Sequence, residues 1–138
     1  MYDAEVASRT STKGTIGELA VIADLLKQGF EVFKEVTASS VIDLIAYKDG
    51  QYKRIQVKTT ESRNDTVIFP ARKGQANHAT YRGDEFDLMA LYVVDKHVVL
   101  YLPIQDLIAN LSGVSVRFSE AKNGAKKNVR RSCDFMRA

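Results

Sequence analysis

Apolar residues recur at three- and four-residue steps between Lys13 and Gln28, and this spacing predicts an amphipathic helix over residues 13–28. The expected buried stripe comprises Ile16, Leu19, Ala20, Ala23 and Leu26. Residues 1–12 predict a loose lead-in, and Gly29 stands where a left-handed helix cap is expected. Within the helix, Gly17 predicts a close approach of the helix backbone to a sheet. The first element is therefore expected to be one helix that packs on a sheet.

The remaining apolar segments are rich in β-branched and aromatic residues, which is typical of strands. We expect strands over residues 30–36, 41–47, 51–59, 66–70, 86–94, 97–102 and 114–118. Pro103 predicts the start of a short helix that ends at Leu111, because proline suits a first helical turn. The polar segment 72–85 contains two glycines and predicts a long loop with no more than one helical turn. This order indicates an α/β fold with a mixed central β-sheet flanked by helices.

Asp49-Gly50 is a dipeptide that two-residue hairpin turns favour, because both central positions need a positive φ. A turn centred there places Asp43 opposite Gln56. Side chains alternate along a strand, so Asp43, Gln56 and Lys58 are expected to share one face of the hairpin. The opposite face is apolar, and its burial fixes this register. That face consists of Ile42, Leu44, Ala46, Ile55 and Val57.

The composition fits a single domain of ordinary size. The 138 residues are 45% hydrophobic and 27% charged, which supplies material for one core, and no repeat or linker divides residues 1–138. No apolar run approaches the length of a membrane span, and the N-terminus is polar. The single cysteine, Cys133, has no second cysteine for an intramolecular disulfide or a shared metal. We therefore expect a cytoplasmic protein with no membrane partner and no organic cofactor.

Charge is distributed unevenly along the chain. The net charge is only +3, yet seven basic and two acidic residues occur from Arg117 onward. A basic tail over residues 119–138 is compatible with binding to a phosphate backbone, and a solvated tail is an equally acceptable interpretation of this feature alone.

An aspartate inside an apolar strand is unusual, because strands disfavour aspartate and a buried carboxylate needs a partner or a metal. Asp43 offers a carboxylate oxygen, Gln56 an amide oxygen and Val57 a backbone carbonyl, and such oxygen ligands suit Mg²⁺. Lys58 would contact a water or a phosphate oxygen beside that cation. An ordinary cross-strand ion pair between Asp43 and Lys58 is the alternative, and the isolated spacing of these residues favours it.

Three motifs together resemble the PD-(D/E)XK, or restriction-endonuclease-like, nuclease superfamily. Its Pro-Asp pair, its acid-X-Lys tripeptide and its preceding helix correspond to Ile42-Asp43, Gln56-Val57-Lys58 and Gly14-Thr-Ile-Gly-Glu18. The most similar branch contains a homing endonuclease encoded by a group I intron, in which glutamine replaces the motif acid. The resemblance covers most of residues 13–60 and extends more loosely over residues 81–103. Two departures are the missing proline before Asp43 and the missing charge at Gln56.

The resemblance implies a Mg²⁺-dependent endonuclease that hydrolyses double-stranded DNA at specific sites, with Mn²⁺ as a substitute. Glu18 is implied as the acid that compensates for Gln56 and joins Asp43 at the cation. Because one chain carries one such site, cutting both strands implies a homodimer or a homotetramer. A resolvase of Holliday junctions and a non-catalytic DNA-binding module on the same fold are the alternatives.

The remaining candidates are side chains that would contact DNA from the start of the helix, the loop over residues 72–85 and the C-terminal tail. They are Lys13, Arg72, Lys73, Gln75, Asn77, His78, Tyr81, Arg82, Lys122, Lys126, Lys127, Arg130 and Arg131. Asp84, Glu85 and Asp87 form an acidic cluster. We interpret that cluster as the surface where a strand begins, with a second cation site as the alternative.

Overall fold

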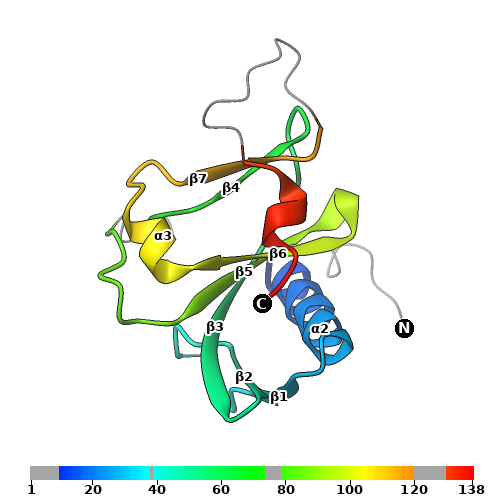
Figure 1. Ribbon diagram of the computed structural model, residues 1–138, viewed down its shortest axis with the longest axis vertical. Helices are drawn as coiled ribbons and strands as arrows, with labels where there is room; N and C mark the ends of the chain where they lie inside the picture. The colour runs from blue at the N-terminus through cyan, green and yellow to red at the C-terminus, as the bar shows by residue number, and fades with distance from the viewer. Residues whose placement is uncertain (1–9, 38, 74–78, 120–129) are drawn as a thin grey trace.

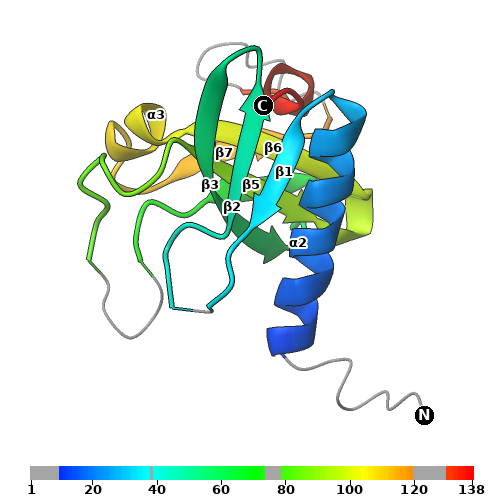
Figure 2. The same cartoon turned by 90° about the horizontal axis from the view of Figure 1, so that it is seen from below.

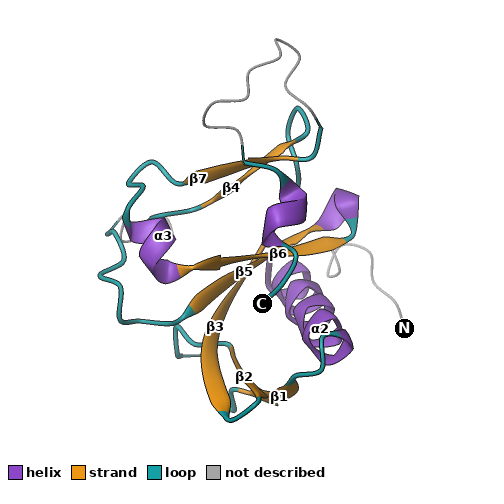
Figure 3. Cartoon of the chain, viewed as in Figure 1, coloured by secondary structure: helices purple, strands orange, loops and turns teal. Residues whose placement is uncertain are grey.

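The computed structural model describes residues 10–37, 39–73, 79–119 and 130–138 (Figures 1 and 3). In chain order, the elements are α2 (Thr10–Lys27), β1 (Glu31–Lys34), β2 (Leu44–Lys48), β3 (Gln51–Thr60), β4 (Thr66–Phe69), β5 (Leu88–Val93), the 3-10 helix η1 (Val94–Lys96), β6 (Val98–Pro103), α3 (Ile104–Ile108), β7 (Val114–Arg117) and the 3-10 helix η2 (Ser132–Phe135). In this described part of the chain, no helix is long and apolar enough to cross a membrane.

The central sheet has five strands in the order β1-β2-β3-β5-β6. β3 and β5 run parallel, whereas the other neighbouring strands are antiparallel. A parallel pair needs a crossover connection, and residues 61–87, which contain β4, provide it. β4 pairs with β7 in a separate two-stranded sheet. The expected α/β fold with a mixed central sheet is confirmed.

Two apolar cores cover the two faces of β5 and β6. On one face, Val21 and Leu25 of α2 pack against residues of β2, β3, β5 and β6. On the other face, β4, β7 and α3 pack against Met89 and Leu91 of β5. Figure 1 shows α2 and the β4–β7 pair on opposite sides of β5 and β6. The central strands are therefore buried on both faces, which holds β3 firmly in place beside β5.

α2 buries a different stripe from the one expected. Val21 and Leu25 are fully buried and follow Gly17 at four-residue steps. The expected stripe is largely exposed, with exposed fractions of 49% at Ile16, 57% at Leu19 and 56% at Leu26. The physical reason is the close approach at Gly17, where an added Cβ would lie 1.8 Å from Oγ1 of Thr59 in β3. The prediction that Gly17 permits close packing is confirmed, and this contact determines which face of α2 meets the sheet.

Turn and cap residues take the conformations expected of them. Asp49 and Gly50 have φ values of 52° and 78°, as a two-residue hairpin turn of type I′ requires. Gly29 follows α2 with φ at 88°, which is a left-handed conformation. Pro103 directly precedes α3, but this helix ends at Ile108 rather than at residue 111. The local signals therefore placed these elements correctly but overestimated the length of α3. They also missed the start of α2, which begins at Thr10 inside the expected lead-in over residues 1–12.

The last described residues pack back on the domain. The ring of Phe135 lies 6.2 Å from that of Phe69, measured between centroids. The backbone N–H of Ala138 donates to Oε1 of Gln28 at 2.9 Å, and Nε2 of Gln28 donates to the carbonyl of Met136 at 3.2 Å. Residues 130–138 are thus part of the packed structure, whereas residues 120–129 lie outside the described residues.

Candidate active site

Asp43 directly precedes β2, and the hairpin register carries it to a position opposite Gln56. Leu44 pairs with Ile55, and the backbone N–H of Asp43 donates to the carbonyl of Ile55 at 2.9 Å. Leu44 and Ile55 are buried under α2, so Asp43 and Gln56 point to the opposite face of the hairpin. Lys58 lies two residues beyond Gln56 and shares that face. The structure thus brings together the three side chains that the turn predicted.

This face of the hairpin is accessible from solvent. Phe33 of β1 and Tyr52 of β3 share it and are exposed. A groove of about 240 Å³ lies beside Asp43, between β1 and the segment that leads into β2. In Figure 2, the segment between β1 and β2 and the segment between β4 and β5 extend from the same side of the molecule. A ligand in this groove would therefore lie beside Asp43.

The Asp43 carboxylate is half-buried and accepts a hydrogen bond from the backbone of β3. The backbone N–H of Val57 donates to its Oδ2 at 2.8 Å. Burial raises the pKa of Asp43, the Val57 N–H lowers it, the charges of Glu18 and Glu35 raise it, and the charge of Lys58 lowers it. The net effect is a raised pKa, chiefly because burial disfavours the charged carboxylate. A cation bound beside Asp43 would favour the charged form.

Glu18 approaches the same carboxylate from α2. It forms an ion pair of 3.8 Å with Lys34 of β1, and its charge contributes to the raised pKa of Asp43. Glu35 joins it from the end of β1, where its Oε1 accepts the backbone N–H of Ser40 at 2.9 Å. Glu35 is absent from the expected site residues, because its place beside Asp43 depends on the pairing of β1 with β2. The charges of two further acidic side chains, Glu18 and Glu35, therefore act on Asp43.

Lys58 lies close enough to lower the pKa of Asp43. The ion pairs within 4.0 Å among the described residues do not include Asp43 with Lys58. The alternative of an ordinary cross-strand ion pair therefore has no support in the geometry. Lys58 instead contributes positive charge to the same face of the sheet.

Tyr81 completes the site from the crossover connection. Its hydroxyl donates to Oε1 of Gln56 at 2.8 Å, and its ring is only 5% exposed. Burial and the charge of Glu85 raise the pKa of Tyr81, so its hydroxyl keeps the proton that it donates. We expected Tyr81 to contact DNA from an exposed loop, and its buried ring places it inside the site instead. No local pattern signals this contact, because it joins residues of β3 and the loop before β5.

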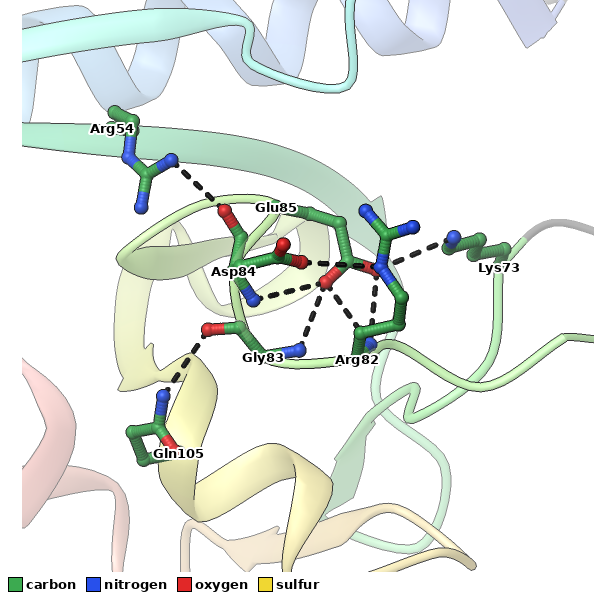
Figure 4. Close-up of polar contacts among 7 residues, drawn as sticks. All are labelled: Arg54, Lys73, Arg82, Gly83, Asp84, Glu85 and Gln105. Carbon is green, nitrogen blue, oxygen red and sulfur yellow. Dashed lines mark hydrogen bonds and ion pairs between the residues drawn. The ribbon is translucent and has the colours of Figure 1, made fainter.

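The acidic cluster before β5 is engaged within the protein (Figure 4). Glu85 accepts the backbone N–H groups of Arg82, Gly83 and Asp84 at 2.9–3.2 Å and pairs with Lys73 at 3.3 Å. Burial opposes the charge of Glu85, but these donors outweigh it and lower its pKa to about 2. Asp87 pairs with Arg54 at 3.1 Å, which also donates to the carbonyl of Asp84 at 2.9 Å. These partners support the interpretation of the cluster as the structured start of a strand.

A family model described as PD-(D/E)XK endonuclease matches residues 8–138. The chain belongs to the PD-(D/E)XK endonuclease family. The structure of a bacterial homing endonuclease, I-Ssp6803I, is similar to that of this family member, with a TM-score of 0.71 and 25% sequence identity. The match covers 93% of this chain and 88% of that chain. The resemblance found in the motifs and the restriction-endonuclease-like fold are thus confirmed.

Two further comparisons of this PD-(D/E)XK endonuclease are with proteins of a phage and an archaeon. Protein 5.3 of Escherichia phage T7 is 31% identical over 90 residues, which cover 64% of this chain and 75% of the relative. Hjc, a Holliday junction resolvase from Archaeoglobus fulgidus, is 17% identical with a TM-score of 0.44, over 76% of this chain and 84% of that chain. The second likeness is too distant for a functional comparison. By its family, this chain is a nuclease.

Nucleases of this family generally use divalent metal ions, and the donor set of this member suits a cation with few protein ligands. Among the residues that the structure describes, no group of three or more His, Cys, Asp and Glu side chains is arranged to hold a metal ion. The oxygen donors of the candidate site include the amide oxygen of Gln56, the Asp43 carboxylate and the Val57 carbonyl. Mg²⁺ accepts such oxygen atoms and keeps several of its own waters. The residues therefore fit a hard, largely hydrated cation.

The basic side chains expected to contact DNA occupy varied surroundings in this endonuclease. Lys73 pairs with Glu85, Arg82 pairs with Asp84 at 3.2 Å, and Lys13 pairs with Glu61 at 3.5 Å. Arg72 and Arg131 are exposed, and Arg130 is partly buried. The other expected residues, Gln75, Asn77, His78, Lys122, Lys126 and Lys127, lie outside the described residues.

Proposed function

We propose that this endonuclease hydrolyses phosphodiester bonds of double-stranded DNA at specific sites, with Mg²⁺ as its cofactor and Mn²⁺ as a substitute. The observation that supports it most is the convergence of Asp43, Gln56 and Lys58 on one accessible face of the hairpin. The charge of Glu18 acts at the same place. The likeness to a bacterial homing endonuclease supports cleavage at specific sites. Its proposed place of action is the cytoplasm, where it meets DNA.

Each residue has a distinct part in this proposal. Asp43 and Gln56 hold the cation together with the carbonyl of Val57, and Glu18 adds the negative charge that Gln56 lacks. When bound, the cation supplies a water of lowered pKa and neutralises charge on the phosphate. Lys58 donates a hydrogen bond to the attacking water or to a non-bridging phosphate oxygen, where negative charge develops in the transition state.

The proposed binding surface for DNA surrounds this face. Basic side chains of the segment before β5 and of the C-terminal region contact phosphates, which gives an affinity that falls as salt rises. The ion pair with Glu85 already engages Lys73 within the protein. Exposed side chains on the open strand face, such as Tyr52, provide contacts from which sequence preference arises.

Cutting both strands of a duplex requires two such sites, and we propose a homodimer or a homotetramer. The exposed stripe of α2 supports it, because Ile16, Leu19, Ala23 and Leu26 have the alternating three- and four-residue spacing of a helix–helix seam. The stripe contains no charged residue, and a second copy presents the same surface to it. We therefore assign the stripe to contact with another copy of this chain.

A cleavage assay tests the proposed activity. Native protein is incubated with plasmid DNA, phage genomic DNA and four-way junctions, in Mg²⁺, in Mn²⁺ and in EDTA. Asp43→Ala and Lys58→Ala are compared with Lys53→Ala, which removes a lysine of the same strand from the opposite face, near Phe30. We expect cleavage of linear duplex by native protein and Lys53→Ala in either cation. The other two variants are expected to lose at least roughly 100-fold in rate while they still bind DNA.

The outcomes separate the alternatives. Cleavage of four-way junctions alone would favour a resolvase of Holliday junctions over a homing-type enzyme. Equal DNA binding by all proteins with no cleavage of any substrate would favour the non-catalytic module, an alternative that the missing charge at Gln56 keeps open. Undiminished cleavage by Asp43→Ala would contradict the proposed site.

A further inference from the structure

Gln56 differs from the acid of the family motif in a way that creates a structural requirement. A carboxylate has two equivalent oxygen atoms, so each rotation of the side chain by half a turn presents an oxygen to a cation. An amide has one oxygen and one NH₂ group, and the same rotation presents hydrogen-bond donors that repel the cation. Gln56 therefore needs a partner that orients its amide group, whereas the motif acid needs no such partner.

Tyr81 is placed to be that partner. Its hydroxyl donates to Oε1 of Gln56 at 2.8 Å. The amide oxygen accepts two hydrogen bonds or ligand contacts, so this donor leaves its second lone pair available. We propose that Tyr81 is a positioning residue, which fixes the amide of Gln56 so that its oxygen faces the metal. This inference rests on the proposed metal-dependent activity of the same site.

The surroundings of Tyr81 hold its hydroxyl in a fixed position. The ring is 5% exposed and packs edge to face on Phe86, with centroids 5.1 Å apart and an interplanar angle of 82°. An aromatic ring packed in this way has little freedom to rotate away from its partner. The hydroxyl is therefore presented to Gln56 by a rigid part of the core.

The backbone that follows Tyr81 is fixed independently. Glu85 accepts hydrogen bonds from the N–H groups of Arg82, Gly83 and Asp84 and pairs with Lys73 (Figure 4). Gln105 of α3 donates to the carbonyl of Gly83 at 3.1 Å and ties the same turn to α3. Partners of this kind, which do not touch the metal themselves, keep a metal ligand oriented. The whole turn thus supports the contact between Tyr81 and Gln56.

The first test removes the hydroxyl and keeps the ring. Tyr81→Phe is compared with Tyr101→Phe, which removes a buried hydroxyl that donates to Asp24 at 2.6 Å on the α2 face of the sheet. Mg²⁺ binding is measured by calorimetry, and cleavage gives kcat and KM for DNA. We expect Tyr81→Phe to lose about 10- to 100-fold in Mg²⁺ affinity and in kcat, with KM little changed. Tyr101→Phe is expected to keep both values within about threefold of native protein.

A second measurement does not depend on cleavage. The side-chain NH₂ signals of Gln56 are assigned in ¹H–¹⁵N spectra from their loss in Gln56→Glu. The chemical shifts of these signals are then compared in native protein, Tyr81→Phe and Tyr101→Phe, before and after Mg²⁺ is added. We expect Tyr81→Phe, but not Tyr101→Phe, to change these chemical shifts in the metal-free protein. We also expect Tyr81→Phe to reduce the change in chemical shift that Mg²⁺ causes. Unmoved signals in Tyr81→Phe would overturn the positioning role even if native protein cuts DNA.

The decisive test asks whether the acid of the motif removes the requirement. Gln56→Glu is prepared alone and together with Tyr81→Phe. Because a carboxylate presents oxygen in either rotation, we expect Tyr81→Phe to reduce Mg²⁺ affinity in the native background and to change it less than about threefold in the Gln56→Glu background. Equal losses in both backgrounds would mean that the hydroxyl acts elsewhere, and this result would overturn the inference. If native protein neither binds Mg²⁺ nor cuts DNA, the proposed function is wrong, and the positioning role of Tyr81 is wrong as well.

Discussion

Gly17 of α2 lies against Thr59 of β3 so closely that a Cβ at position 17 would stand 1.8 Å from Oγ1 of Thr59. The two residues belong to the helix that carries Glu18 and to the strand that carries Gln56 and Lys58. Their contact therefore sets the distance between two parts of the candidate site. It also explains why a glycine, which weakens helices, occupies the middle of a helical turn.

Gly17→Ala is expected to destabilise the fold. The forced separation of α2 and β3 costs about 1–3 kcal/mol, and the gain of about 1 kcal/mol that alanine brings to a helix leaves a net loss of up to about 2 kcal/mol. Urea denaturation measures the free energy of unfolding. Gly14→Ala is the matched control, because the same helix has open space at that position, and we expect it to gain about 1 kcal/mol. Equal stabilisation by both substitutions would show that the contact is not tight.

Asp43→Asn is expected to raise the stability of the metal-free protein at neutral pH. The pKa of Asp43 is raised in the folded state by burial and by Glu18 and Glu35, so its ionisation opposes folding above its unfolded pKa. Asparagine removes that opposition and still offers an oxygen to the Val57 N–H. Thermal melts in EDTA should show a higher Tm for the variant at about pH 7, with the difference vanishing below about pH 3.8.

The same thermal melts are repeated with Mg²⁺ in place of EDTA. The cation should stabilise native protein, because it binds the folded state only, and should have little effect on Asp43→Asn. The opposite result in EDTA would contradict the prediction. If Asp43→Asn is less stable than native protein at neutral pH without metal, the charge of Asp43 is well compensated within the protein.

Glu85→Gln is expected to lower stability and to weaken its dependence on acid. The donors around Glu85 outweigh the effect of its burial and lower its pKa to about 2, against an ordinary value of 4.5. A lowered carboxyl pKa gives stability that is complete above the ordinary value and is lost as the pH falls towards about 2. The variant should lose about 2 kcal/mol at neutral pH, since several hydrogen bonds to a charge are weakened.

Asp84→Asn serves as the control for Glu85→Gln. Asp84 belongs to the same turn, but its side chain is 74% exposed and pairs with the equally exposed Arg82. Exposed ion pairs contribute little, so we expect a change below about 0.5 kcal/mol. Denaturation at several pH values between about 2 and 7 compares the two variants. A native-like acid profile in Glu85→Gln would rule out Glu85 as the source of the acid sensitivity.

Leu19→Glu is expected to shift the protein towards a monomer. Leu19 lies in the middle of the exposed stripe of α2, and a charge there opposes the burial of the stripe against a second copy. Leu111→Glu is the control, because Leu111 is similarly exposed but lies outside α2. Sedimentation velocity gives the mass in solution. If native protein is itself a monomer at every concentration tested, or if both variants keep the native assembly, the stripe is not the contact.

The hairpin could be predicted from sequence because its signals are local. Asp49-Gly50 specifies the turn, and the apolar residues on one side specify the face, so the position of Asp43 opposite Gln56 followed directly. The buried face of α2 could not be predicted in this way. Apolar residues occur around much of that helix, and the choice between stripes depended on which backbone could approach Thr59. Gly17 indicated the buried face of α2 correctly, whereas the spacing of the apolar residues alone indicated the wrong face.

The contact of Tyr81 with Gln56 and the presence of Glu35 depend on tertiary structure. Tyr81 lies in a polar segment without a clear period, and its burial results from Phe86 and from the pairing of β3 with β5. Glu35 reaches Asp43 only because β1 pairs with β2. Both residues are distinguished by their neighbours in space, and a single sequence contains no record of those neighbours.

The parallel pairing of β3 with β5 has a consequence for how the nuclease forms. The hairpin that carries Asp43, Gln56 and Lys58 closes through a two-residue turn, which is a fast event between neighbours in the chain. Tyr81 reaches Gln56 only after the connection over residues 61–87 has closed, and such distant pairings form slowly. On a ribosome, the three hairpin residues emerge before Tyr81 and β5 do. A chain still being synthesised therefore has its acidic and basic groups in place before the tyrosine can orient the amide, and the site becomes complete only when the sheet does.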